Sequence, residues 1–283
     1  MTQFSKYHGL GNDFILVDCQ QEGRSSLTRW KEWSAQVTRR GHSIGADGVL
    51  VATRNAEDGN LEMTVYNADG SQPEMCGNGL RCFVHFAVRE LGETRDTFSV
   101  HTDAGLLETS WRAELKRERL QVTVNMGLPV LEPIDVPAVQ VQNPTIHLLN
   151  NEPLAVHAVS MGNPHGVIFL DGAKPMSWMK ETALALEGSG VFPEGVNTGF
   201  ANVSGDRMSL VVHERGCGFT EACGTGACAA VVAAIQDGTL PREKWIEVSL
   251  PGGTLEIRWR GRGHSVEMTG PSEFVYAGQT PLT

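Results

Sequence analysis

The sequence lacks the signatures of several common protein classes. It contains no P-loop, and no Gly-x-Gly-x-x-Gly motif follows an expected strand, so no signal for a nucleotide cofactor is present. No apolar run reaches the roughly 18 residues of a membrane-spanning helix, and Met1–Asp18 has no apolar core of signal-peptide length. We therefore expect a cytoplasmic protein.

Positive charge and close-set cysteines are also scarce. Lys and Arg number 23 against 33 Asp and Glu, and the resulting net charge of −10 argues against nucleic acid or an anionic membrane as a partner. The six cysteines include no Cys-x2-Cys or Cys-x3-Cys pair of the kind that zinc sites usually contain. We expect reduced thiols and no metal, and a zinc-binding module remains an alternative that elemental analysis would test. No lysine stands in a glycine-rich context that would indicate pyridoxal phosphate.

The most informative stretch of the chain surrounds Cys223. This cysteine lies in a glycine-rich bend that leads directly into the small and apolar run Ala227–Ile235. Thr225 is expected to be the N-cap of a helix there, and Gly238 is expected to end it. A helix without a polar face is buried, and its N-terminus favours an anion and lowers the pKa of a nearby thiol. We therefore expect Cys223 to react beside a bound anion.

A second stretch repeats this pattern around Cys76. Both cysteines begin a Cys-Gly-x-Gly motif followed by an apolar helical pattern, and they lie 147 positions apart. The same offset aligns Asn67 with Glu214, and other similar segments recur at 148 and 151 positions. The 283 residues favour about two domains, so we interpret the repeat as an internal duplication. Two thiols at two equivalent helix starts suggest one site between the halves.

The remaining pattern predicts an α+β fold. Outside the two cysteine helices, the sequence predicts helices near Leu27–Thr38 and Trp178–Leu186. Short strands of alternating or β-branched character are expected at 4–18, 49–51, 63–66, 97–101, 106–111, 120–124, 155–160, 167–170, 208–213, 245–250, 254–259 and 265–268. Each half thus combines many short strands with one buried helix, which indicates mixed or antiparallel sheets.

A pair of cysteines suits one particular chemistry. Inverting a tetrahedral carbon requires a base on one face and an acid on the other, so a thiolate must face a thiol. The α-proton of an amino acid is only weakly acidic, and charge that develops on its carboxylate must be stabilised. Two converging helix N-termini supply hydrogen-bond donors for this charge.

The sequence resembles the diaminopimelate epimerases over nearly its whole length. The motifs that carry the resemblance are Tyr7-His8-Gly9-Leu10-Gly11-Asn12-Asp13-Phe14, Tyr66-Asn67-Ala68-Asp69-Gly70-Ser71, Cys76-Gly77-Asn78-Gly79-x-Arg81-Cys82, Met161-Gly162-Asn163-Pro164-His165, Gly195-Val196-Asn197, Glu214-Arg215-Gly216-x-Gly218 and Ala222-Cys223-Gly224-Thr225-Gly226-Ala227-Cys228. The resemblance implies an isomerase of lysine and peptidoglycan-precursor biosynthesis. Such an enzyme interconverts LL- and meso-2,6-diaminopimelate without pyridoxal phosphate, metal or reductant, as a homodimer.

The resemblance also implies how the chain is divided. Residues 1–126, joined by a returning tail at 271–283, would form one domain, and residues 127–270 the other. Each domain would be a barrel-like sheet around a central helix, and the active site would lie in the cleft between the two pseudo-symmetric domains.

Roles follow from the resemblance residue by residue. Cys76 and Cys223 would be the two acid/base thiols. His165 and Glu214 would adjust the thiol pKa values, and Arg215 would bind the distal carboxylate. The residues implied to bind the substrate are Asn12, Asn67, Gly77, Asn78, Asn163, Asn197, Glu214, Arg215, Gly224 and Thr225.

Two departures from the family pattern affect recognition rather than the thiols. Many members have Asp-Gln where this chain has Asp47-Gly48, which removes a side-chain amide from the substrate end. The usual Gly-Glu-Thr before the second cysteine is Gly218-Phe219-Thr220 here.

Several alternatives stay open from the residues alone. A proline racemase or hydroxyproline epimerase would also use two cysteines, and a non-catalytic amino-acid-binding relative could share the architecture. Asn12 and Asn163 could be turn residues, and Arg215 could form only a surface ion pair with Glu214. The other cysteines, Cys19, Cys82, Cys217 and Cys228, are expected to be structural.

Overall fold

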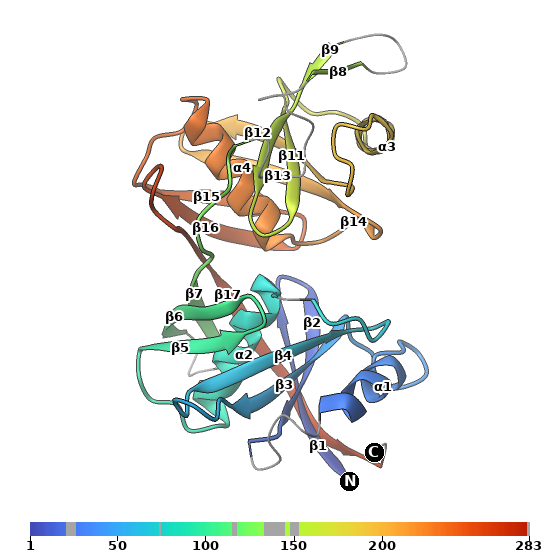
Figure 1. The fold of residues 1–283 in the computed structure, drawn as a ribbon, viewed down its shortest axis with the longest axis vertical. Coiled ribbons are helices and arrows are strands. Elements are labelled where there is room, and N and C mark those ends of the chain that lie inside the picture. Colours follow the sequence, from blue (N-terminus) through green and yellow to red (C-terminus); the bar gives the residue numbers. More distant parts are fainter. Residues whose placement is uncertain (21–26, 74, 115–117, 133–144, 148–152, 282–283) are drawn as a thin grey trace. The chain divides into compact units, whose positions relative to one another are not determined.

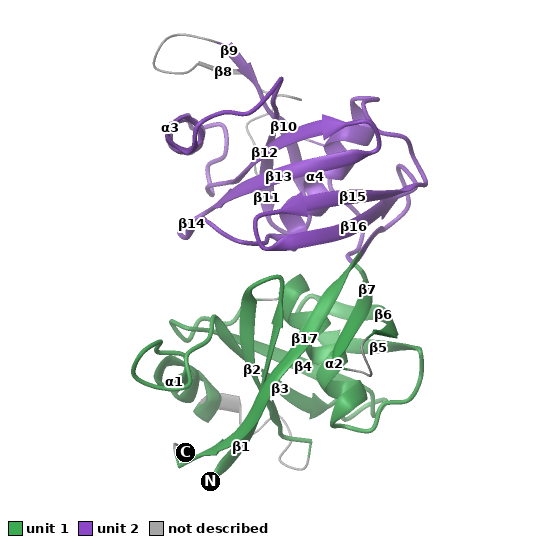
Figure 2. Cartoon of the chain, turned by 180° about the vertical axis from the view of Figure 1, so that it is seen from behind, with its two compact units in different colours: residues 1–125, 269–283 green, residues 126–268 purple. Residues whose placement is uncertain are grey.

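The chain folds into two compact units that follow the same plan. The computed structural model describes residues 1–20, 27–73, 75–114, 118–132, 145–147 and 153–281 (Figure 1). Unit 1 consists of residues 1–125 together with 269–283, and unit 2 of residues 126–268 (Figure 2). Within each unit a mixed sheet surrounds one apolar helix.

Unit 1 is a closed sheet. Its strands are β1 (Thr2–Gly9), β2 (Asn12–Asp18), β3 (Gly48–Arg54), β4 (Leu61–Asn67), β5 (Thr97–Thr102), β6 (Gly105–Glu114), β7 (Arg119–Asn125) and β17 (Val266–Thr280). They pair in that order, and β17 also pairs with β1, so the sheet closes on itself. The pairs β2–β3 and β4–β5 are parallel, whereas β1–β2, β3–β4, β5–β6 and β6–β7 are antiparallel.

Helix α2 (Gly77–Arg89) lies inside this closed sheet and forms hydrogen bonds with β17. The helix contacts β1, β2, β3, β4 and β7, and its residues from Gly77 to Val88 are buried. Two of its buried polar residues contact β17. Arg81 Nε donates to the carbonyl oxygen of Pro271 at 3.3 Å, and His85 Nδ1 lies 3.2 Å from Ser272 Oγ. The strand that closes the sheet is therefore hydrogen-bonded to the helix at its centre.

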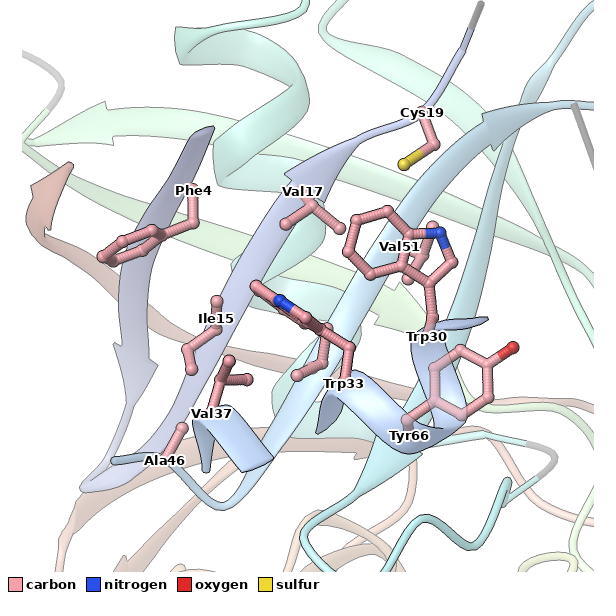
Figure 3. Close-up of a cluster of buried hydrophobic side chains, with 11 residues drawn as sticks. Phe4, Ile15, Val17, Cys19, Trp30, Trp33, Val37, Ala46, Val51 and Tyr66 are labelled. Carbon is pink, nitrogen blue, oxygen red and sulfur yellow. The ribbon is translucent and has the colours of Figure 1, made fainter. Parts of the chain in front are cut away.

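Helix α1 (Leu27–Val37) covers the outer face of the same sheet. Trp30 and Trp33 pack edge to face with ring centroids 5.0 Å apart, and both are almost fully buried. Figure 3 shows their rings against Val17 and Val51, which point outward from neighbouring strands. Because side chains alternate along a strand, β2 and β3 bury one face against α1 and the other against α2.

Unit 2 repeats this topology. Its strands are β10 (His157–Ser160), β11 (Pro164–Phe169), β12 (Asn197–Ser204), β13 (Arg207–Glu214), β15 (Trp245–Leu250), β16 (Gly253–Trp259) and the start of β17, with the short β14 (Gly218–Phe219) paired to β13. The pairs β11–β12 and β13–β15 are parallel, like β2–β3 and β4–β5 of unit 1. Helix α4 (Gly224–Gln236) packs against β10 to β13 and β16, and α3 (Met176–Gly188) contacts β12.

The segment after β7 closes the second sheet. The backbone N–H of Met126 donates to the Val266 carbonyl at 2.8 Å, and the N–H of Val266 donates to the Gly127 carbonyl at 2.9 Å. Val130 then forms an antiparallel bridge to Ser160 at the end of β10. The sheet of unit 2 is thus completed by the segment that follows β7, and the sheet of unit 1 by β17, which follows β16.

The predicted α+β class with one central helix in each half is confirmed. The sequence patterns missed β12, whose start Asn197-Thr198-Gly199 has a turn-like composition, and the full length of β17. Both strands are defined by pairing with distant segments, which local composition does not report. A separate two-stranded sheet joins β8 (Thr145–His147) to β9 (Pro153–Ala155). No helix among the described residues is long and apolar enough to cross a membrane.

The contact between α2 and β17 gives a first prediction. Ser272 is fully buried, so replacing it with alanine should remove its hydrogen bond to His85 and lower the free energy of unfolding by about 1 kcal/mol. Urea denaturation followed by circular dichroism measures the change. Ser209→Ala on the exposed face of β13 is the matched control and should leave the transition where it is. Equal stabilities of Ser272→Ala and wild type would contradict the role of this contact.

Candidate active site

Both predicted catalytic cysteines occupy the N-cap positions of the two central helices. Cys76 precedes α2 with φ −138° and ψ 111°, and Cys223 precedes α4 with φ −120° and ψ 105°. The carbonyl of each cysteine accepts the first helical hydrogen bond, from Leu80 at 2.8 Å and from Ala227 at 3.0 Å. The prediction that Thr225 is the N-cap is therefore wrong, because the helix already begins at Gly224.

The second glycine of each Cys-Gly-x-Gly motif makes room for the thiol. A Cβ atom at Gly79 would lie 3.5 Å from Cys76 Sγ, and one at Gly226 would lie 3.1 Å from Cys223 Sγ. The Gly79 N–H donates to Cys76 Sγ at 3.4 Å, whereas Cys223 Sγ lies 3.6 Å from the Thr225 hydroxyl oxygen. In both units the thiol thus folds back over the first helical turn, where N–H groups without helical partners concentrate positive potential.

Burial is the largest influence on the pKa of the Cys223 thiol. Its side chain is almost fully buried, and this desolvation raises the thiol pKa well above its ordinary value. The Glu214 carboxylate raises the pKa further, and hydrogen bonds from Thr225 and the Gly226 N–H lower it less. The expectation of a lowered pKa at Cys223 is therefore wrong in this structure, because desolvation and the Glu214 carboxylate outweigh the hydrogen bonds from Thr225 and the Gly226 N–H. Cys223 is a neutral thiol at neutral pH.

Three predicted residues of unit 2 come together on the helix-facing side of the sheet. His165 of β11 is in register with Asn197 of β12, and the β12–β13 register continues from Thr198 and His213 to Asn197 and Glu214. These side chains share the strand face that also carries Val212, which lies against α4 at Gly226. The sheet thus presents an imidazole, an amide and a carboxylate at the same end as the start of α4.

Hydrogen bonds hold three predicted substrate-binding residues of unit 2, namely Asn197, Glu214 and Arg215. Asn197 Oδ1 accepts from the Arg215 backbone N–H at 3.0 Å, and Glu214 Oε1 accepts from the Thr220 hydroxyl at 2.5 Å. The Arg215 side chain runs across Gly195, where a Cβ atom would lie 2.6 Å from its Cδ, and it donates to the Glu194 carbonyl. Among the described ion pairs none joins Arg215 to Glu214, so the surface-pair alternative does not describe this structure. Thr220 is a residue that sequence patterns did not single out.

His165 is neutral in the folded protein. It is buried, and desolvation lowers its pKa from 6.5 to about 3. Its Nε2 lies 2.9 Å from Asn163 Oδ1, which can only accept, so Nε2 carries the hydrogen. His165 and Asn163 are therefore paired with each other at the start of β11.

In unit 1 the predicted residues Asn12 and Asn78 are also paired. Asn78 Nδ2 donates to Asn12 Oδ1 at 3.2 Å, and Asn12 Nδ2 donates to Asp47 Oδ2 at 2.7 Å. Asn78 and Gly77 form the first turn of α2, directly after Cys76. Asn67 lies at the end of β4, opposite Gly48, and donates to the Ser71 hydroxyl at 2.9 Å. Neither Asp47 nor Arg81, which bonds to Asn78, was predicted as a site residue, since neither has a spacing that indicates one.

The registers place different residues at equivalent points of the two sheets. In unit 1, Phe14 of β2 is in register with Gly48 of β3, and Gly48 with Asn67 of β4. The equivalent positions in unit 2 are His165, Asn197 and Glu214. A Cβ atom at Gly48 would lie only 2.7 Å from the Tyr66 carbonyl oxygen, so this backbone does not accommodate the glutamine found in many family members.

No three His, Cys, Asp or Glu side chains gather into a metal-binding group in the part of the chain that the structure describes. Cys228, five positions after Cys223, lies fully buried within α4.

Comparisons with known proteins agree on one family. The sequence matches the family model described as diaminopimelate epimerase over residues 4–132 and 157–275. The diaminopimelate epimerase of Synechococcus elongatus is 40% identical over 287 aligned positions, covering 99% of this chain and 98% of that protein. The enzyme of the same name from Teredinibacter turnerae is 40% identical over 284 positions, covering 99% of each chain.

Two solved structures share the fold at low identity. A probable proline racemase from Agrobacterium radiobacter has a TM-score of 0.70 at 14% identity and covers 100% of this chain and 94% of its own. A hydroxyproline epimerase from Agrobacterium vitis also has a TM-score of 0.70, at 13% identity, covering 99% of this chain and 90% of its own.

The low pKa of His165 predicts a pH dependence. An unfolded histidine gains a proton below its pKa of about 6.5, whereas folded His165 stays neutral down to about 3. Its contribution to stability is therefore complete above pH 6.5 and is lost, at about 1.4 kcal/mol per pH unit, as the pH falls toward 3. The stability difference between wild type and His165→Gln should shrink by this slope in urea denaturation between pH 7 and 5. The exposed His264→Gln provides the matched control, and a pH-independent difference for His165→Gln would contradict the prediction.

Proposed function

This chain belongs to the diaminopimelate epimerase family, and we propose that it inverts one α-carbon of LL-2,6-diaminopimelate to give the meso isomer. The observation that carries the proposal is the doubled arrangement of a cysteine as N-cap of a buried helix, present once in each unit. The protein is an isomerase that acts on a small molecule, and the roles of individual residues below are part of the proposal.

The reaction needs one base and one acid. One cysteine, as the thiolate, removes the α-proton, and the other, as the thiol, delivers a proton to the opposite face of the same carbon. The mechanism therefore requires both thiols to reach one substrate carbon in the active enzyme. The reaction is reversible, so each cysteine serves as base in one direction and as acid in the other. A neutral Cys223, with its pKa raised by burial and by Glu214, fits the proton donor in one of these directions.

The helix starts stabilise the charge that develops during proton transfer. As the α-proton leaves, negative charge spreads onto the adjacent carboxylate. In each unit the first helical turn, Gly77-Asn78 or Gly224-Thr225, offers backbone N–H groups to that charge. Removing one such preorganised donor typically costs about 3 kcal/mol of transition-state stabilisation.

The second amino-acid end of the substrate has its own recognition residues in the proposal. Arg215 and the amides of Asn67 and Asn197 bind the distal carboxylate, and Glu214 binds the distal ammonium. Support comes from the way unit 2 holds three of them, with Asn197 bonded to the Arg215 backbone and Glu214 bonded to Thr220. Asn12 and Asn163 complete the substrate-binding set, and His165 adjusts thiol acidity from the helix-facing side of β11.

Isotope incorporation tests the two-base mechanism. In deuterium oxide, the product should gain deuterium at the inverted carbon while unreacted LL-diaminopimelate initially gains none, because each thiol serves one face. Proton NMR of the α-position follows both pools. Cys76→Ala and Cys223→Ala should each abolish epimerisation with the circular dichroism spectrum unchanged, whereas Cys217→Ala, at an exposed cysteine, should retain it. Full activity in either of the first two variants would refute the assignment.

Arg215 tests the choice of substrate. Each charged hydrogen bond contributes about 1.5–3 kcal/mol, and an Arg–carboxylate fork makes two of them, so Arg215→Met should lower kcat/KM for diaminopimelate by roughly 100- to 10,000-fold. Arg207→Met, at an exposed position at the start of β13, the strand that ends just before Arg215, is the matched control and should change kcat/KM little. Reactivity of the thiols toward iodoacetamide should be the same in all three proteins. Efficient turnover of proline by the wild type would instead favour the proline racemase or hydroxyproline epimerase alternative.

The family relationship also leads us to expect a cytoplasmic homodimer. Light scattering of the purified protein measures the mass in solution, against 30.7 kDa for one chain.

A further inference from the structure

The internal duplication distinguishes residues that the architecture needs from residues that only one unit uses. When the two helices are aligned at Cys76 and Cys223, Arg81 of α2 and Cys228 of α4 occupy equivalent positions. The strand registers give Gly48 of unit 1 and Asn197 of unit 2 equivalent positions. The residues that precede them, Asp47 and Val196, are therefore also equivalent. Unit 1 thus carries a cation and an anion at positions where unit 2 carries a buried thiol and a buried valine. The shared fold does not require either charge.

Four residues of unit 1 form a continuous hydrogen-bonded chain between these two charges. Arg81 Nη2 donates to Asn78 Oδ1 at 2.9 Å, and Asn78 Nδ2 donates to Asn12 Oδ1 at 3.2 Å. Asn12 Nδ2 then donates to Asp47 Oδ2 at 2.7 Å. Arg81 is fully buried, Asn78 is almost fully buried, and the chain ends at the half-exposed Asp47.

The hydrogen bonds that link these four side chains can run in only one donor-to-acceptor direction. A guanidinium can only donate hydrogen bonds and a carboxylate can only accept them. Asn78 must therefore turn its oxygen toward Arg81 and its nitrogen toward Asn12. Asn12 must in turn present its oxygen to Asn78 and its nitrogen to Asp47. Rotating either amide by 180° would bring two donors or two acceptors together.

From this geometry we infer that Arg81 and Asp47 are positioning residues that fix the amide orientations of Asn12 and Asn78. The inference rests on the proposed function, in which Asn12 binds the substrate and the first turn of α2, which includes Asn78, donates to the substrate carboxylate. An amide that is free to rotate presents its oxygen to an anion for part of the time. Because Arg81 and Asp47 lie at the two ends of the hydrogen-bonded series, the two amides are held in one orientation before the substrate arrives. This order lowers the cost of binding.

Asp47→Asn is the most direct test because asparagine can both donate and accept. In this variant only Arg81 still orients the hydrogen-bonded side chains, so Asn12 is held less firmly. Asn78, which Asp47 does not contact, then loses the part of the constraint that Asn12 transmits from Asp47. The side-chain amide resonances of Asn78 should therefore shift in protein labelled with 15N-asparagine, with Asn12→Asp and Asn78→Asp used for assignment. For diaminopimelate, kcat/KM should fall about tenfold, the effect of one ordinary hydrogen bond. Reactivity of both catalytic thiols toward iodoacetamide should not change.

Two further variants separate positioning from general structure. Arg40 donates to Asp47 Oδ1 at 2.8 Å and also contacts Asp13, so Arg40→Gln removes the ion pair between Arg40 and Asp47 but leaves the bond from Asn12 to Asp47. This variant should keep both the Asn78 resonances and kcat/KM near the wild-type values. Asp47→Glu retains a carboxylate that can only accept, and it should restore the wild-type amide pattern at least in part.

The two readouts distinguish failure of this inference from failure of the proposed function. An unchanged Asn78 resonance in Asp47→Asn, or an equal shift in Arg40→Gln, would overturn the positioning role. Absence of any turnover of diaminopimelate by the wild type would overturn the proposed function, whereas the amide spectra, recorded without substrate, would still decide whether the charges orient the asparagines.

Discussion

The start of a helix inside a closed sheet is the constraint on which the rest of this protein depends. The first N–H groups of such a helix have no helical carbonyl to bond, and they lie where water has little access. Both central helices begin with a cysteine N-cap that is followed by a Gly-x-Gly turn, so a thiol lies beside backbone donors. The feature that solves a problem of folding therefore also prepares a place where a thiol and a carboxylate can meet.

The duplication supplies this arrangement twice, and each copy then surrounds it with different charges. Unit 2 lines the ends of its strands with His165, Asn197 and Glu214, and it holds Cys223 as a neutral thiol. Unit 1 has Phe14 and Gly48 at two of the equivalent positions, and it places its charges instead at Asp47 and Arg81. Because the fold tolerates both solutions, these charges are available for recognition and chemistry, while Arg81 also holds β17 through the Pro271 carbonyl.

Gly48 shows how backbone geometry limits that variation. The position faces the helix beside Asn67, where many relatives carry a glutamine, yet a Cβ atom here would approach the Tyr66 carbonyl to 2.7 Å. A side chain at this point would need a shift of the β3–β4 pair. The departure from the family pattern is thus built into the local strand geometry, and the neighbouring Asp47–Asn12 bond supplies polar order at this end of unit 1.

Features encoded by neighbours in the chain were predictable from the sequence: the repeated Cys-Gly-x-Gly, the apolar run Ala227–Ile235, most strands, and the family. Their signals are periodicity and spacing, which operate over a few residues. What only the tertiary structure decided depends on residues far apart in sequence. β17 completes a sheet begun by β1, and Arg81 lies next to Asn78 and Pro271. Burial near Glu214 raises the pKa of Cys223 despite the hydrogen bonds from Thr225 and the Gly226 N–H. Desolvation and hydrogen-bond direction arise only when distant segments pack together, so no local pattern in the sequence could report them.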